Sequence, residues 1–135
     1  MSTRKSLIRN SNQVTQAVDF TGVQNGKIHP SDIDAVFEFD NDVLILIEVK
    51  RSNNDIPTGQ RLLLERIADS WHTGKSVVLK VEHDFGDELR SIPLEVCYVT
   101  SVYYNNKWTV LANKEDLKSY LNRIGTSFEC PKCKF

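Results

Sequence analysis

Apolar and polar residues alternate from residue 33 to residue 50, the pattern expected of β-strands that bury one face. The polar run Asp40-Asn41-Asp42 interrupts this alternation and predicts a turn between two antiparallel strands. If the loop has three residues, Phe39 faces Val43, and the apolar residues of both strands fall on one face. The pattern therefore predicts a β-hairpin whose register is set by the length of its turn.

The register decides which charged side chains meet at the open end of this hairpin. Counting back from the turn places Asp34 directly opposite Glu48, with Cβ atoms about 4.5–5.5 Å apart. Lys50 follows two residues later, on the same face as Glu48. A two-residue turn or a bulge would separate Asp34 from Glu48. Because buried charges are costly unless they are paired or coordinated, this cluster is a candidate for chemistry.

A helix and a third strand are expected after the hairpin. Apolar residues at helical spacing predict a helix from residue 60 to about residue 71, with Thr58 as its N-cap and Gly74 at its end. The apolar segment at residues 76–82 predicts a buried strand. Since the order strand, helix, strand favours a right-handed crossover, the two strands are expected to be parallel in one sheet.

The C-terminal half of the chain predicts a second hairpin and a final helix. The hairpin covers residues 94–111 and turns at Asn105-Asn106. Asn113 is the expected N-cap of a helix that runs to about residue 123, and Gly125 is expected to end that helix.

The chain length of 135 residues fits one domain with a core of its own. We expect residues 1–125 to form a single α/β domain, in which a central mixed β-sheet, built from the β-hairpin and the βαβ crossover, is flanked by helices. The formal net charge of −1 offers no bulk attraction to a polyanion, so nucleic-acid binding would need a local basic patch. The sequence shows neither a membrane-spanning run nor a secretory signal, so we expect a cytoplasmic protein with no membrane partner.

Residues 126–135 are expected to form a C-terminal tail that carries Cys130 and Cys133 at CxxC spacing. The odd total of three cysteines argues against a disulfide framework and fits a reducing compartment. Cys130 and Cys133 supply half of a zinc site, which would need Cys97 with a histidine, or a second subunit, to be complete. A reduced, disordered tail is an equally good interpretation.

The predicted cluster of Asp34, Glu48 and Lys50 has the groups that a phosphodiester hydrolase needs. Magnesium is usually bound by one or two carboxylates together with waters and a substrate phosphate oxygen. The bound metal polarises the phosphate and helps to ionise the attacking water, and Lys50 can orient that water or bind the phosphate. We therefore expect Mg²⁺, with Mn²⁺ able to substitute, and no organic cofactor. Alternatively, Glu48 and Lys50 are solvated residues that pair with each other or with Arg51.

Two segments, SDIDAVFEF and LILIEVK, resemble the core of the PD-(D/E)XK nuclease superfamily, in which an acidic residue on one strand precedes Glu-x-Lys on the next. The resemblance extends over residues 31–82 and implies a restriction-endonuclease-like core. It implies that Asp34 and Glu48 are metal ligands, that the Val49 carbonyl is a further metal contact, and that Lys50 is the catalytic lysine.

Two positions depart from the superfamily pattern. Ile33 stands where the family has its proline, which leaves Asp32 as a rival of Asp34 for the first acid. Gln60 falls where exonuclease-like branches carry a glutamine near the active site, whereas Leu64 replaces the tyrosine that follows in those branches. The resemblance therefore adds Gln60 to the candidate catalytic residues.

The resemblance implies a Mg²⁺-dependent deoxyribonuclease, expected to be an endonuclease that acts on DNA as a homodimer. The expected DNA contacts are basic residues, namely Lys5, Arg9, Arg51 and Arg61. Two alternatives stay open. One is a catalytically silent nucleic-acid-binding or interaction module with the same fold, and the other is a nuclease that acts on RNA.

Overall fold

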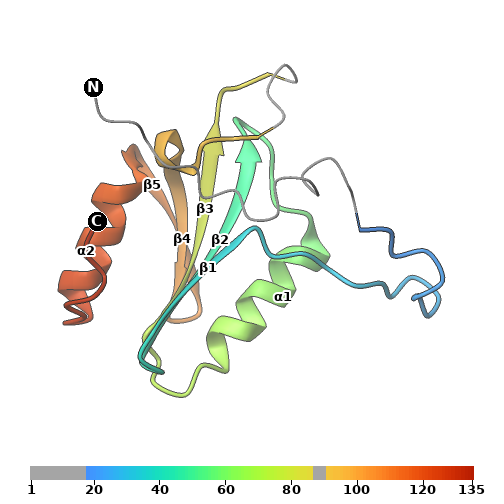
Figure 1. Ribbon diagram of the computed structural model, residues 1–135, viewed down its shortest axis with the longest axis horizontal. Helices are drawn as coiled ribbons and strands as arrows, with labels where there is room; N and C mark the ends of the chain where they lie inside the picture. The colour runs from blue at the N-terminus through green and yellow to red at the C-terminus, as the bar shows by residue number, and fades with distance from the viewer. Residues whose placement is uncertain (1–17, 87–90) are drawn as a thin grey trace. The chain divides into compact units, whose positions relative to one another are not determined.

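The computed structural model of the protein describes residues 18–86 and 91–135 (Figure 1). The chain divides into two compact units, Met1–Ser31 and Asp32–Phe135. In the first unit, Asn25 and Ile28 form an antiparallel bridge. The helices and strands of the described residues lie in the second unit.

The second unit contains a five-stranded mixed sheet in the order β1-β2-β3-β4-β5. Its strands are β1 (Ala35–Phe39), β2 (Val43–Arg51), β3 (Ser76–His83), β4 (Tyr98–Tyr104) and β5 (Lys107–Asp116). Its helices are α1 (Thr58–Asp69), α2 (Leu117–Ser127) and the short 3-10 helix η2 (Leu94–Val96). Strands β2 and β3 are parallel, and the other neighbouring pairs are antiparallel. The predicted α/β class, mixed sheet and βαβ crossover are therefore confirmed.

The register of the first hairpin matches the prediction. Phe39 pairs with Val43 across a three-residue loop, and the pairing continues to Ala35 opposite Ile47. The loop is closed by the hydrogen bond that the Asp42 N–H donates to the Phe39 carbonyl at 2.8 Å. Asp40 and Asn41 have φ of 51° and 58°. Asp and Asn tolerate this left-handed conformation better than most residues, so the polar run suits the turn.

The side chains of β2 alternate between two hydrophobic clusters, one on each face of the sheet. One cluster packs β2 against α1, and the other packs it against α2, so the two helices cover opposite faces (Figure 1). The face toward α1 receives Leu44 and Leu46, and the face toward α2 receives Val43, Ile45 and Ile47. Continuing this alternation places Glu48 and Lys50 on the α1 face, at the end of the strand.

Both ends of α1 differ from the prediction. Pro57 occupies the N-cap position in place of Thr58, and no side chain caps the helix there. The Pro57 carbonyl instead accepts the Arg61 N–H at 2.9 Å, which is the first helical hydrogen bond. At the other end, Ser70 is the C-cap, so the helix stops before Gly74, which lies in the next turn with φ of 74°.

The predicted start of the last helix is also wrong. Asn113 lies inside β5, because β5 remains paired with β4 as far as Asp116 opposite Tyr98. The Asp116 side chain then caps α2 by accepting the Ser119 N–H at 3.1 Å. Gly125, the predicted end of the helix, is buried within it. The two-residue turn at Asn105-Asn106 is confirmed, whereas the segment expected to begin that hairpin contains η2.

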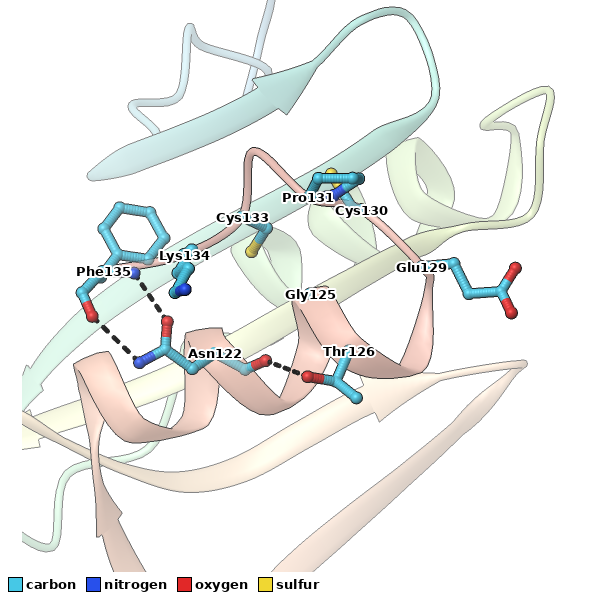
Figure 2. A pocket seen from close by; sticks show the side chains of 9 residues that line it. All are labelled: Asn122, Gly125, Thr126, Glu129, Cys130, Pro131, Cys133, Lys134 and Phe135. Carbon is cyan, nitrogen blue, oxygen red and sulfur yellow. Dashed lines mark hydrogen bonds between the residues drawn. The ribbon is translucent and has the colours of Figure 1, made fainter.

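The C-terminal residues pack onto the core instead of forming a disordered tail. Cys130 and Cys133 are buried in the same hydrophobic cluster as Cys97, and all three cysteines are free. The Asn122 side chain fastens the end of the chain, since it accepts the Phe135 N–H and donates to the Phe135 carbonyl (Figure 2). An open pocket of ≈ 560 Å³ lies between α2 and these last residues.

Neither α1 nor α2, the α-helices of the described part of the chain, is long and apolar enough to cross a membrane.

We expect Tyr103→Phe to change the alkaline stability of the fold. The buried Tyr103 hydroxyl donates to Asp69 at 2.8 Å, and burial together with this hydrogen bond raises its pKa to about 12. In the unfolded chain this hydroxyl ionises near pH 10, so folding retains a proton that the unfolded state loses. Its stabilising contribution is therefore complete below about pH 10 and is lost as the pH rises toward about 12.

The measurement is urea unfolding of both proteins between pH 8 and pH 11.5. At pH 8 the variant should lose about 1 kcal/mol, because one hydrogen bond is removed. Above about pH 10 this difference should shrink, since the variant has no hydroxyl to ionise at that position. A difference that stays constant across this range would contradict the expectation.

Candidate functional site

The open end of the β1–β2 hairpin brings two carboxylates together, as the register predicted. Asp34 precedes β1, and its Oδ2 accepts the Val49 N–H at 2.7 Å. This bond holds the Asp34 carboxylate against β2, beside Glu48. Asp34 is exposed, whereas the Glu48 side chain is only 6% exposed. One carboxylate therefore faces solvent while its neighbour is buried.

Two further side chains reach Glu48 from different elements. The Lys50 Nζ lies 3.6 Å from Glu48 Oε1, and the Gln60 Nε2, from the first turn of α1, donates to Glu48 Oε2 at 3.1 Å. The same Gln60 amide also donates to the backbone carbonyl of Asp32. The sequence-predicted residues Asp34, Glu48, Lys50 and Gln60 are thus gathered into one cluster at the end of β2.

The electrostatics of this cluster favour a bound cation. Burial raises the pKa of Glu48, and the negative charge of Asp34 and a hydrogen bond between the two carboxyl groups raise it further. The hydrogen bond from Gln60 and the positive charge of Lys50 act in the opposite direction but do not cancel the rise. The two carboxylates are therefore unfavourable as a doubly ionised pair, and a cation between them would relieve the repulsion.

The position of the cluster in the fold is also typical of ligand sites. In sheets with parallel strands, ligands tend to bind beyond the carboxyl ends of those strands. Glu48 and Lys50 lie at the carboxyl end of β2, next to the parallel strand β3. The apolar part of β2, before Glu48, is fully buried and anchors the site to the core.

The geometry distinguishes the two candidates for the first acid. Asp34 raises the pKa of Glu48 through its charge and its hydrogen bond. The contact of Asp32 with the cluster is made by its backbone carbonyl, which accepts from Gln60. This arrangement favours Asp34 as the acid that shares a cation with Glu48. The proposed contact of the Val49 carbonyl with a metal stays a prediction.

The predicted DNA contacts are placed only in part. Arg51 is exposed at the end of β2, directly after Lys50. Arg61 lies in the first turn of α1, where its Nη1 donates to Glu65 Oε2 at 2.6 Å. Lys5 and Arg9 lie outside the described residues.

Sequence reasoning missed the side chains that β3 adds next to the cluster. Parallel pairing places Lys80 beside Glu48, and Glu82 beside Lys50. Lys80 Nζ lies 3.3 Å from Glu82 Oε2, so β3 carries a second charged pair on the α1 face. The alternation in VVLKVEH was the available signal, because it puts both charged residues on one face of a predicted strand.

The cysteines are not part of this cluster, since they lie in the core on the α2 side of the sheet. Within residues 18–86 and 91–135, no three or more His, Cys, Asp or Glu side chains are grouped in a way that could hold a metal ion. The zinc site considered for Cys130 and Cys133 stays without support from the geometry.

Comparisons with protein-family models, with curated proteins and with solved structures find no match to this chain.

Asp34→Asn should stabilise the protein in the absence of divalent metal. The change removes the negative charge next to the buried Glu48, while the amide oxygen can still accept the Val49 N–H. At pH 8 in EDTA, we expect urea unfolding to show a gain of about 0.5–1 kcal/mol. Asp32→Asn is the matched control and should change stability by less than about 0.5 kcal/mol. A clear loss of stability in Asp34→Asn would show that the two carboxylates do not repel each other.

Proposed function

We propose that this protein is a nuclease that hydrolyses phosphodiester bonds in DNA with the help of Mg²⁺, and that it has the restriction-endonuclease-like core of the PD-(D/E)XK superfamily. The observation that carries the proposal is the pairing of Asp34 with the buried Glu48, whose pKa is raised, next to Lys50. Two carboxylates can bind the metal that assists phosphodiester hydrolysis, and a nearby lysine can offset the charge that develops on the phosphate.

The donor set fits magnesium. Asp34, just before β1, and Glu48, on β2, offer carboxylate oxygens, and magnesium is a hard cation that is usually bound by one or two carboxylates. These two residues would hold the metal, together with the Val49 carbonyl. The metal would polarise the scissile phosphate and lower the pKa of the attacking water.

The other residues of the cluster have separate tasks. The Lys50 ammonium, at 26% exposure, can reach both Glu48 and a phosphate, so it would orient the attacking water and offset the charge that develops on the phosphate. Gln60 would fix the orientation of the Glu48 carboxylate, since its amide bridges Glu48 and the Asp32 carbonyl. Neither the role of Lys50 nor that of Gln60 requires an organic cofactor.

The proposed partners are DNA and a second copy of the chain, and the proposed location is the cytoplasm. Arg51, Arg61, Lys5 and Arg9 would contact the DNA backbone, and an endonuclease acting on both strands of a duplex would work as a homodimer with one site per strand. We place the protein in the cytoplasm, where the free thiols of Cys97, Cys130 and Cys133 would stay reduced.

The test is cleavage by the purified protein on a matched panel of end-labelled substrates. The panel holds single-stranded, duplex and branched DNA and the corresponding RNAs, each with Mg²⁺, with Mn²⁺ and with EDTA. We expect cleavage of DNA with either metal and none with EDTA. Cleavage of RNA alone would favour the RNA nuclease. Absence of both cleavage and metal binding would overturn the proposal in favour of a silent binding module.

A further inference from the structure

The Glu82 carboxylate, at the carboxyl end of β3, is buried, and both of its oxygens have polar partners. Its Oε1 accepts the Asn53 N–H at 2.9 Å, and its Oε2 accepts the Thr100 hydroxyl at 2.6 Å and lies 3.3 Å from Lys80 Nζ. Burial opposes the ionisation of Glu82, but the hydrogen bonds from Thr100 and Asn53 and the charge of Lys80 hold its pKa below the usual range. Glu82 is therefore a fixed anion with defined partners.

The partners of Glu82 include the segment that joins two parts of the candidate site. This connecting segment, residues 52–57, joins Arg51, the last residue of β2, to Thr58, the first residue of α1, and so lies between Lys50 and Gln60 in the chain. Asn53 lies in this segment with φ of 68° and donates its N–H to Glu82. Asp55 of the same segment lies 3.7 Å from Lys80 Nζ, which in turn contacts Glu82. The segment is thus held to β3 by the Asn53 hydrogen bond and by the Ser52 N–H, which donates to the His83 carbonyl at 2.8 Å, whereas the pair made by the fully exposed Asp55 adds little.

Stability alone is a poor explanation for these contacts. A buried ion pair is often no more stabilising than well-packed apolar residues of the same volume. A carboxylate at this position does, however, provide a directional acceptor for a backbone N–H that an apolar side chain could not provide. The geometry therefore indicates that Glu82 holds the backbone in place at Asn53.

We propose that Glu82 is a positioning residue for the nuclease: it fastens the connecting segment to β3 and thereby sets the positions of Lys50 and Gln60 relative to Glu48. The inference rests on the proposed function. In the strand register Lys50 lies opposite Glu82, one pair before the β2–β3 ladder ends at Arg51 and His83, and beyond that end the chain needs further restraint. Small displacements of catalytic groups cost large factors in rate, so loss of this restraint should lower turnover.

The experiment compares Glu82→Leu with Glu82→Gln in the full-length protein. Leucine removes the acceptor, whereas the glutamine amide oxygen can still accept the Asn53 N–H. We expect Glu82→Leu to lower kcat at least about tenfold, with KM and the dissociation constant for Mn²⁺ unchanged within about threefold. Glu82→Gln should stay within about threefold of wild-type kcat. Tyr103→Phe is the control, because it removes a hydrogen bond between the sheet and the far end of α1.

Hydrogen exchange gives a readout that does not need activity. In Glu82→Leu, the amides of residues 52–56 should exchange faster, while those of β2 before Glu48 keep their protection. Wild-type kcat in Glu82→Leu, an equal loss in Glu82→Gln, or unchanged exchange would overturn the positioning role and leave the nuclease intact. If Glu82→Leu shows the expected faster exchange but the wild type cleaves nothing, the nuclease is refuted. Glu82 would then hold the connecting segment without any role in catalysis.

Discussion

Lys50→Met is expected to lower the rate of DNA cleavage by about 10²–10⁴-fold while the protein stays folded. Methionine retains most of the length and apolar character of the lysine stem but removes the ammonium group, which lies 3.6 Å from Glu48. Lys50 is only partly buried and lies at the end of β2, so the core should tolerate the change. Single-turnover cleavage with saturating Mg²⁺ measures the effect on the chemical step.

Two controls show whether the loss of activity is specific to Lys50. Lys75→Met removes a lysine that pairs with Asp42 at 3.3 Å, at the opposite end of the sheet, and should cleave like the wild type. Asp32→Asn should also remain active, because the Asp32 contact with the site is made by its backbone. More than a tenth of wild-type activity in Lys50→Met would contradict its assigned role. Inactive Asp32→Asn together with active Asp34→Asn would identify Asp32 as the first acid.

Gly125→Ala should produce the largest change in stability. Gly125 is buried in α2, and a Cβ there would lie 2.1 Å from the Cys133 carbonyl oxygen. This contact involves backbone, so the C-terminal residues have to move away from the helix. Overpacking of this kind costs about 1–3 kcal/mol. Urea unfolding should show the loss, and the buried thiols of Cys130 and Cys133 should react faster with a thiol reagent in the folded variant.

Gly59→Ala is the matched control for this change. Gly59 also lies in a helix, α1, but a Cβ there would meet nothing within 4 Å. Alanine should therefore be neutral or stabilising by up to about 1 kcal/mol, because it favours helix more than glycine does. Equal stabilities for the two variants would show that the C-terminal residues do not pack against Gly125. Cleavage by Gly125→Ala, measured well below its melting temperature, should stay normal, since the site lies on the α1 face.

The sequence was most informative where the structure depends on local rules. The loop Asp40-Asn41-Asp42 determines the pairing of β1 with β2, and a two-residue periodicity then fixes which side chains share a face. For this reason the meeting of Asp34 with Glu48 could be predicted. Gln60 became a candidate through the resemblance to the superfamily, and it lies in the first turn of α1, a helix that periodicity predicted.

The residues that were missed depend on partners distant in the sequence. The pairing of Glu82 with Lys50 requires the register of two parallel strands joined through a helix, which no turn specifies. Asn113 is as good a cap as Asp116 by residue type, and only the pairing of β5 with β4 decides between them. Gly125 resembled a helix end, but its lack of a side chain accommodates the returning C-terminal residues.

Titration with Mn²⁺ followed by electron paramagnetic resonance tests whether Asp34 and Glu48 hold one divalent cation between them. We expect one Mn²⁺ site per chain in the wild type and in Asp32→Asn. Asp34→Asn and Glu48→Gln should each weaken that site at least about tenfold, which corresponds to about 1.4 kcal/mol. Equal Mn²⁺ binding by all four proteins, or none by the wild type, would show that Asp34 and Glu48 do not share a cation.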